Sequence, residues 1–398
     1  MTLRQENPIL YFDNASTSYP KPSNVAKEVA HYLEFIGVSP GRGGYDLAQQ
    51  ANQLVEDVRE RIAALVNAKN SEHIVFTHNA THAINIVLKG LLKPGDHVII
   101  SNFEHNAVYR PLHKLKCEQN VSYDIWESDP LGNFNIDDLK KLIKPETKLV
   151  ALNHASNVLG VLSPVLETAA FLEKHQIPFL VDVAQTAGLF PVSFAPYADY
   201  IVGTGHKSLL GPPGVGFLYI RDGDSLSTLY EGGSGGLSKS PYQPHTLPSK
   251  FESGTCNYLG IAGLKGSLDY LEKYGQERMC TKMQNYTEQA LTTLQDIPDI
   301  TIYGPLVKTK KVPLISFNLE GYYANEVAFL LQESSICVRA GIQCAPLIHK
   351  TLKTLPHGTV RLSFGHHNSE IELEILQEKL IEIQKNRKKG IENVKISA

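Results

Sequence analysis

The middle of the chain alternates short, nearly continuous apolar runs with longer segments that carry apolar residues at helical spacing. Apolar runs bounded by turn residues are typical of buried strands, and strands that alternate with helices form mostly parallel sheets wrapped by helices. The predicted strands are 73–77, 97–101, 148–153, 178–183, 200–203 and 215–220, and the predicted helices include 81–92 and 163–176. We therefore expect an α/β fold built on a large, mostly parallel sheet.

The pattern changes near residue 260. A long helical stretch over about 260–295 is followed by apolar runs that helical segments interrupt, and these runs are 301–304, 314–321, 336–341 and 359–365. This succession is typical of a smaller α+β unit. The prediction is a large domain over 1–260 and a small α+β domain over 261–398.

Composition narrows the class of protein. Of the 398 residues, 42% are hydrophobic and 20% are charged, and the net charge is −3, as in ordinary soluble globular proteins. The acidic balance and the lack of a mixed basic and aromatic patch argue against a nucleic-acid partner. The sequence shows no apolar run long enough to predict a membrane span or a signal peptide.

The number and spacing of the cysteines indicate the redox state of the cellular compartment. There are five, an odd number, and they form no Cys-x-x-Cys pair: Cys117, Cys256, Cys280, Cys337 and Cys344. This usage argues against a disulfide framework or a metal site and predicts a reducing cytoplasm. For four of them we expect the role of a small buried hydrophobic residue. Cys344 is treated separately below.

Polar residues follow two of the predicted strands, where ligands of α/β sheets collect. Asp182 ends an apolar run, so its carboxylate needs a cation, a metal or a ligand to offset desolvation, and Gln185 can face the same site. A second strand leads into a Gly- and Pro-rich loop that contains Thr204, His206 and Lys207. Lys207 is either an ordinary surface lysine or a Schiff-base lysine whose amine is kept neutral.

Three further strand ends carry candidates. Thr81 stands near the start of a helix, where it caps the helix or helps to bind a phosphate. His105 could stack on an aromatic ligand or move a proton, and Asn157 is a neutral hydrogen-bond donor. A phosphate site, a stacking ring, a carboxylate, a donor and a lysine together match what pyridoxal 5'-phosphate (PLP) requires of a protein.

These residues lie in motifs that resemble those of a known family. The chain resembles the class V aminotransferase-like group of fold type I PLP enzymes, and within it the group II cysteine desulfurases and selenocysteine lyases. The similarity covers nearly the whole chain in order, through YFDNASTSYPKP, SPGRGGYDLA, NATHAINIVLKG, EHNA, NHASNVLG, VDVAQTAG, GHKSLLGPPGVG, FESGTCNYLGIAGL, VRAGIQCAPL and GTVRLSFGHHN. It implies a seven-stranded type of sheet in the large domain, with residues 1–14 packing on the small domain.

The resemblance implies a role for each matching residue. Lys207 matches the Schiff-base lysine, Asp182 the partner of the pyridine nitrogen, Gln185 the neighbour of the ring hydroxyl, and His105 the histidine that stacks on the ring. The residues expected at the cofactor phosphate are Ala80, Thr81, Thr204 and His206. The residues expected at the substrate are Arg361, which pairs with its carboxylate, with Asn157, Arg339 and Ala15.

Cys344 matches the cysteine that takes sulfur from the substrate as a persulfide. Taken alone it could be a filler thiol. It follows the predicted strand 336–341, in a loop marked by Gly341 and Pro346, and Arg361 comes 17 residues later at the end of the next predicted strand. A short link would keep this loop near the substrate, and Arg339 is a candidate cation for activating the thiol.

Three residues depart from the family pattern. Gln343 stands where many group II members have His, Tyr258 where a small hydroxyl residue is common, and Tyr45 where His is frequent. They leave the substrate open between L-cysteine and L-selenocysteine. The alternatives are a selenocysteine lyase, and a PLP-dependent C–S β-lyase or aminotransferase in which Cys344 is not essential. The resemblance further implies a homodimer and a sulfur-acceptor protein.

Overall fold

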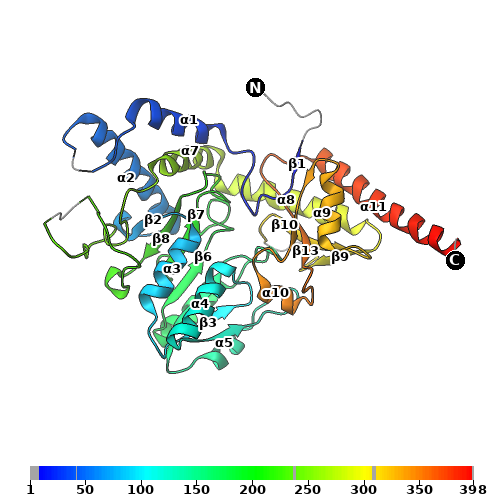
Figure 1. Ribbon diagram of the computed structural model, residues 1–398, viewed down its shortest axis with the longest axis horizontal. Helices are drawn as coiled ribbons and strands as arrows, with labels where there is room; N and C mark the ends of the chain where they lie inside the picture. Colours follow the sequence, from blue (N-terminus) through cyan, green and yellow to red (C-terminus); the bar gives the residue numbers. More distant parts are fainter. Residues whose placement is uncertain (1–8, 42, 236–238, 307–310, 397–398) are drawn as a thin grey trace.

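The computed structural model describes residues 9–41, 43–235, 239–306 and 311–396, with side chains up to residue 387. Its larger sheet has seven strands in the order β2-β8-β7-β6-β5-β3-β4 (Figure 1). Only β8 runs antiparallel to its neighbours, so the predicted mostly parallel α/β sheet is confirmed. The strands are β2 (Ile74–Thr77), β3 (His97–Ser101), β4 (Ser122–Trp126), β5 (Thr147–Asn153), β6 (Phe179–Asp182), β7 (Tyr200–Thr204) and β8 (Gly216–Ile220).

Hydrophobic side chains cover both faces of this sheet. In β3, Val98 and Ile100 belong to one buried cluster while Ile99 belongs to another, because successive strand residues point to opposite faces. The helices of this half are α1 (Ser23–His31), η1 (Tyr32–Ile36), α2 (Asp46–Val66), η2 (Ser71–His73), α3 (Ala80–Leu91), α4 (Asn106–Gln119), α5 (Ile136–Leu142), α6 (Val165–His175), η3 (Gly223–Ser225) and α7 (Tyr258–Tyr274). Burial on two faces explains why most of these strands read as continuous apolar runs.

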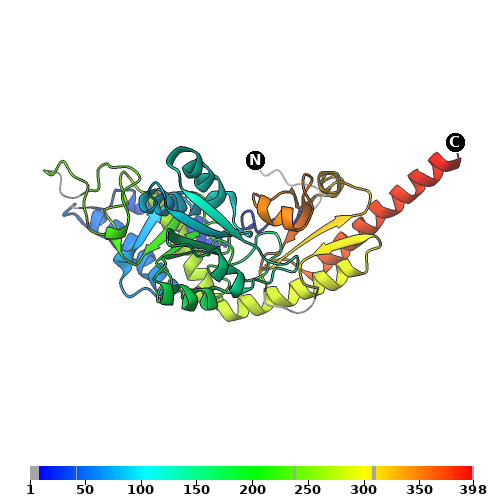
Figure 2. The same cartoon turned by 90° about the horizontal axis from the view of Figure 1, so that it is seen from below.

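A second sheet lies beside the first (Figure 1). It is antiparallel, in the order β12-β13-β10-β9, and a short parallel pair joins β1 to β11. Its elements are β1 (Leu10–Tyr11), α8 (Gln276–Gln295), β9 (Ile300–Tyr303), β10 (Leu314–Leu319), α9 (Ala324–Gln332), β11 (Ile336–Cys337), β12 (Arg339–Gly341), α10 (Pro346–Thr351), β13 (Thr359–Ser363) and α11 (Glu370–Ile396). Figure 2 shows α8 running along the side of the molecule between the two sheets, and α11 extending away from it.

The structure differs from the predicted elements in three places. The single helix over 260–295 is two helices, because the chain turns at Gly275 with φ of +87°. The strand at 336–341 is divided between β11 and β12, which lie in different sheets. The edge strand β4 was not predicted, since its sequence SYDIW is only partly buried.

The domain boundary at 260 stays a prediction. Helix α7 packs on α1 and α2, and β1 pairs with β11. Within the described part of the chain, no helix is long and apolar enough to cross a membrane.

Candidate active site

A cavity of about 440 Å³ lies where the carboxyl ends of the parallel strands face the second sheet. Every residue predicted to bind cofactor or substrate lines it. These residues are Ala15, Ala80, Thr81, His105, Asn157, Asp182, Gln185, Thr204, His206, Lys207, Arg339, Cys344 and Arg361. The structure therefore brings together side chains that are up to 346 positions apart (361 − 15).

Asp182 and Lys207 have opposite charges within the buried part of the cavity. Burial raises the pKa of Asp182, while the N–H of Ala184, at 2.8 Å, and the charge of Lys207 lower it. Burial also lowers the pKa of Lys207, and Asp182 opposes that shift. A desolvated amine is more easily obtained in its neutral, nucleophilic form. The pair thus combines an amine suited to imine chemistry with a carboxylate that gains from a cationic ligand.

His105 is the N-cap of α4 and a neutral imidazole. Burial and the nearby charges of Lys207, Arg110 and Arg361 lower its pKa to about 4. The backbone N–H of Ala107 donates to its Nδ1 at 3.0 Å, so the ring proton resides on Nε2. The imidazole can therefore donate one hydrogen bond into the cavity and offers a flat face for stacking.

The start of α3 also lines the cavity. The side chain of Asn79 accepts the N–H of His82 at 2.9 Å, and the N–H groups of Ala80 and Thr81 remain as donors at a positive dipole end. Thr204 lines the same cavity, and its buried Oγ1 has no hydrogen-bond partner in the described structure. Such a set of unused donors suits a phosphate.

Arg361 lies in the middle of β13, not at the strand end as predicted, and is 2% exposed. Its Nη1 donates to the carbonyl of Asn157 at 3.0 Å, and its Nη2 donates to Asp13 and Ser16. Nε is buried and has no partner in the described structure. Of five guanidinium N–H donors, Nε–H and one hydrogen of Nη1 thus remain for a ligand.

The loop that carries Cys344 is held in an unusual conformation. Gln343 and Cys344 have φ values of 45° and 58°, in the left-handed region that residues other than Gly and Asn rarely adopt. The backbone carbonyl of Gln343 accepts from Asn157 Nδ2 at 2.7 Å, and that of Cys344 accepts from the N–H of Asn106 at 2.7 Å. These contacts hold an exposed thiol at the rim of the cavity.

The three departures from the family pattern lie in different places, and only Gln343 lines the cavity. The Gln343 side chain points away from the thiol, since its Nε2 donates to the Thr359 carbonyl and its Oε1 accepts from His349. Tyr258 begins α7 and packs partly buried against the core, and Tyr45 is exposed before α2. Arg42, in the Gly-Arg-Gly-Gly motif, lies outside the described residues.

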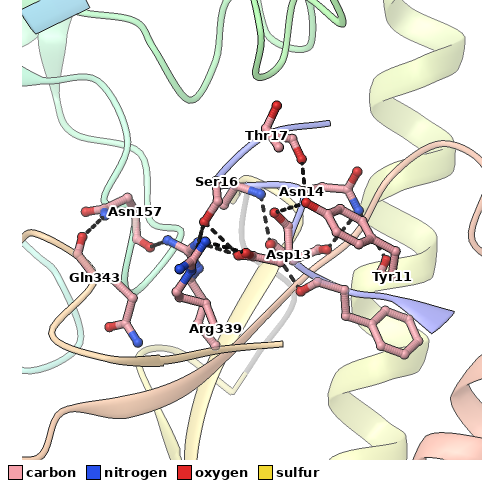
Figure 3. Close-up of polar contacts among 12 residues, drawn as sticks. Tyr11, Asp13, Asn14, Ser16, Thr17, Asn157, Arg339 and Gln343 are labelled. Atoms are coloured by element: carbon pink, nitrogen blue, oxygen red, sulfur yellow. Dashed lines mark hydrogen bonds and ion pairs between the residues drawn. The ribbon is translucent and has the colours of Figure 1, made fainter. Parts of the chain in front are cut away.

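Sequence reasoning missed Asp13, Ser16 and Glu104. Asp13 and Ser16 contact both Arg361 and Arg339, and Figure 3 shows the two residues beside Arg339. Glu104 is fully buried: its Oε1 accepts from Ser101 Oγ at 2.6 Å and from the N–H of Asn153 at 2.7 Å. Burial raises the pKa of Glu104 to about 8. The only sequence signal was that each lies in a motif already quoted.

The reading of four cysteines as buried residues was wrong. Cys117 is exposed, and Cys256, Cys280 and Cys337 are partly buried. None of the five cysteines forms a disulfide in the described structure.

Comparisons with known proteins place the chain in a family. The family model described as Aminotransferase class-V matches residues 10–376, and the chain belongs to this family. A probable cysteine desulfurase of Methanothermobacter thermautotrophicus is 34% identical over 393 residues, covering 96% of this chain and 97% of that protein. A cysteine desulfurase of Escherichia coli is 33% identical over 349 residues, covering 85% of this chain and 84% of that protein.

Solved structures agree with this assignment. The apo structure of a cysteine desulfurase from Thermococcus onnurineus NA1 has a TM-score of 0.89 and 33% identity, with 95% of each chain covered. The fold and the family resemblance that the sequence predicted are therefore confirmed.

Proposed function

We propose that this protein is a PLP-dependent cysteine desulfurase, which converts L-cysteine to L-alanine and transfers the sulfur to Cys344 as a persulfide. The observation that carries the proposal is one cavity lined by Lys207, Asp182, Arg361 and an exposed Cys344. Relatives that span almost the whole chain at 34% identity are named as probable cysteine desulfurases, which supports the same activity.

The residues present fit PLP. The free N–H groups at the start of α3 and the unpartnered hydroxyl of Thr204 suit its phosphate, and His206 lines the same end of the cavity. Asp182 would hold the ring nitrogen protonated, and His105 would stack on the ring. Bound PLP supplies an electron-accepting ring conjugated to the substrate Cα.

The protein's own side chains then bind the substrate and move its protons. An unused donor of Arg361 binds the carboxylate of L-cysteine, which orients Cα toward Lys207 and the side chain toward Cys344. The neutral amine of Lys207 accepts the Cα proton. His105, with its proton on Nε2, donates a hydrogen bond to the substrate or the ring.

Cys344 completes the reaction. Its thiolate forms a bond to the substrate sulfur while the carbon–sulfur bond breaks, and the electron pair of that bond stays with the carbon fragment. That fragment takes up a proton and leaves as L-alanine. The overall reaction converts L-cysteine and a protein thiol to L-alanine and a persulfide, so no external oxidant or reductant is needed.

We also propose that the protein acts as a homodimer in the cytoplasm and passes its sulfur to an acceptor protein. The exposure of Cys344 at the rim of the cavity supports access by such an acceptor, and an odd number of cysteines with no disulfide among them in the described structure supports a reducing compartment. L-selenocysteine is the second substrate to test, because it shares every group that the cavity recognises in L-cysteine.

The test measures alanine, sulfide and pyruvate released from L-cysteine by the wild-type holoenzyme, Cys344→Ala and Cys117→Ala, with a reductant present. Cys117 is also exposed but lies on α4 away from the cavity lining, so its variant is the matched control. We expect equimolar alanine and sulfide that disappear only in Cys344→Ala. Pyruvate that is formed equally by all three proteins would identify a β-lyase instead. Alanine release from L-selenocysteine alone, retained in Cys344→Ala, would identify a selenocysteine lyase.

A further inference from the structure

A carboxylate from the N-terminal segment contacts both arginines of the cavity, and Figure 3 shows it beside Arg339. Asp13 Oδ1 contacts Arg361 Nη2 at 3.0 Å, and its Oδ2 contacts Arg339 Nη2 at 2.8 Å. Ser16 Oγ donates to Asp13 at 2.7 Å and accepts from Arg361 Nη2 at 2.8 Å and Arg339 Nε at 3.2 Å. One carboxylate thus bridges both guanidinium groups.

The position of Asp13 is set by backbone contacts. Asp13 forms a parallel bridge with Ser363 of β13, and the hydroxyl of Tyr11 donates to its carbonyl at 3.2 Å. The residue is 7% exposed. Burial and these backbone contacts place its carboxylate where Ser16 and both arginines hold it.

Asp13 therefore sets the charge of this end of the cavity. Arg339 and Arg361 are two cations, and Asp13 is one anion in direct contact with both, so the group carries one net positive charge (2 − 1). A single positive charge matches a single carboxylate. Two arginines without Asp13 would match a ligand with two acidic groups.

The two arginines also differ in location. Arg361 is buried in β13, and half of the Arg339 side chain is exposed, five residues before the thiol of Cys344. An amino acid whose α-carboxylate binds Arg361 and whose side chain points to Cys344 would present a side-chain acid to Arg339. Asp13 already pairs with Nη2 of Arg339, and Ser16 accepts from its Nε, so such an acid would meet a guanidinium group whose charge is already offset.

We propose that Asp13 is a specificity-determining residue that makes the cavity select amino acids with one acidic group and reject those with a second acid on the side chain. It does so by neutralising Arg339 and by placing a negative charge near the side-chain position, a repulsive element against the wrong ligand. The inference rests on the proposed orientation of the substrate, in which the carboxylate binds Arg361.

The experiment uses L-aspartate and L-asparagine, which have nearly the same shape and differ by one charge. Each is titrated into the holoenzyme, and binding is followed by the change in cofactor absorbance, so no desulfuration is required. For wild type we expect asparagine to bind at least as well as aspartate. For Asp13→Asn, we expect the affinity ratio of aspartate to asparagine to rise about tenfold, because a freed Arg339 pairs with the added carboxylate.

Ser16→Ala is the matched control. It removes hydrogen bonds to both arginines but leaves the charge of Asp13, so we expect a ratio within about threefold of wild type. The double variant Asp13→Asn with Arg339→Gln is expected to return the ratio to the wild-type value. A purely structural role of Asp13 would weaken both ligands equally. An unchanged ratio in Asp13→Asn would overturn the proposal.

If Asp13→Asn yields no folded holoenzyme, Asp13→Ser takes its place. This variant removes the charge and leaves room for water, and we expect the same rise in the affinity ratio of aspartate to asparagine. The outcome is independent of the desulfurase test. A shifted ratio in a protein that makes no alanine from L-cysteine supports this inference and refutes the proposed function. Alanine formation with an unchanged ratio supports the proposed function and refutes this inference.

Discussion

The buried acid Glu104 gives a prediction that can be worked out from its surroundings. Its Oε2 is buried and has no hydrogen-bond partner in the described structure, and Asp182 adds a second negative charge nearby. Burial, with a smaller contribution from that charge, raises the pKa of Glu104 from 4.5 to about 8. Folded Glu104 therefore keeps a proton that the unfolded chain loses at a much lower pH.

The sign of the effect on stability follows from proton binding. Between pH 4.5 and about 8 the folded state binds more protons than the unfolded state, so the free energy of unfolding falls as pH rises and then levels off. Each pH unit is worth about 1.4 kcal/mol, so the loss between about pH 5 and about pH 7 is roughly 3 kcal/mol. Glu104→Gln has no proton to lose, and its amide oxygen can still accept from Ser101 and Asn153.

The assay is urea unfolding of the apoprotein at a series of pH values, followed by circular dichroism. We expect the free energy of unfolding of Glu104→Gln, relative to wild type, to rise by roughly 3 kcal/mol from about pH 5 to about pH 7. An exposed control, Glu118→Gln on α4, should show a constant difference. A Glu104→Gln difference that is flat with pH would refute the protonated state. An infrared carbonyl band of a protonated acid, lost in the variant, is an independent check.

Three further predictions concern binding. Arg361→Lys should raise the KM for L-cysteine by roughly tenfold or more at unchanged PLP content, because the three ammonium hydrogens would all be used by the protein acceptors of Arg361; a KM within about twofold of wild type in steady-state kinetics would contradict this. Thr204→Val should lower PLP affinity about tenfold without lowering the melting temperature of the apoprotein, since its buried hydroxyl has no partner within the described residues; spectrophotometric titration and differential scanning fluorimetry separate the two effects. Gly216→Ala should cost about 1–3 kcal/mol and weaken PLP binding, because its Cβ would lie 2.8 Å from the backbone of Asn79; unchanged affinity in the same titration would show that the start of α3 does not hold the phosphate.

The sequence predicted the strand-end residues well for a physical reason. Buried strands such as β6 are short apolar runs, and parallel strands end at one edge of the sheet, so Asp182 and Lys207 could be placed together without coordinates. The features that were not predicted depend on tertiary packing. β4 is an edge strand with mixed polarity, and the left-handed backbone at Gln343 and Cys344 depends on contacts with Asn106 and Asn157.

The network around Asp13 was beyond sequence reasoning. Asp13 and Arg361 are 348 positions apart, and their contact depends on a bridge between the N-terminal segment and β13. Apolar periodicity reports which face of an element is buried, but it does not report which distant element covers that face. Charge patterns also gave no sign that Arg339 is already neutralised.

The pairing of the N-terminal segment with the second sheet has a consequence for the order of events during synthesis. Chains emerge from the ribosome beginning at the N-terminus, and their early parts can fold before the rest is made. The strand that ends at Asp182 and the strand that leads to Lys207 are complete long before Arg361 is added, whereas Asp13 must wait for β13 before it has a partner. A growing chain thus carries Lys207 and Asp182, the proposed PLP contacts, well before it has Arg361, the proposed substrate-binding arginine. With these roles, the cavity can select its substrate only when the N-terminal segment meets β13.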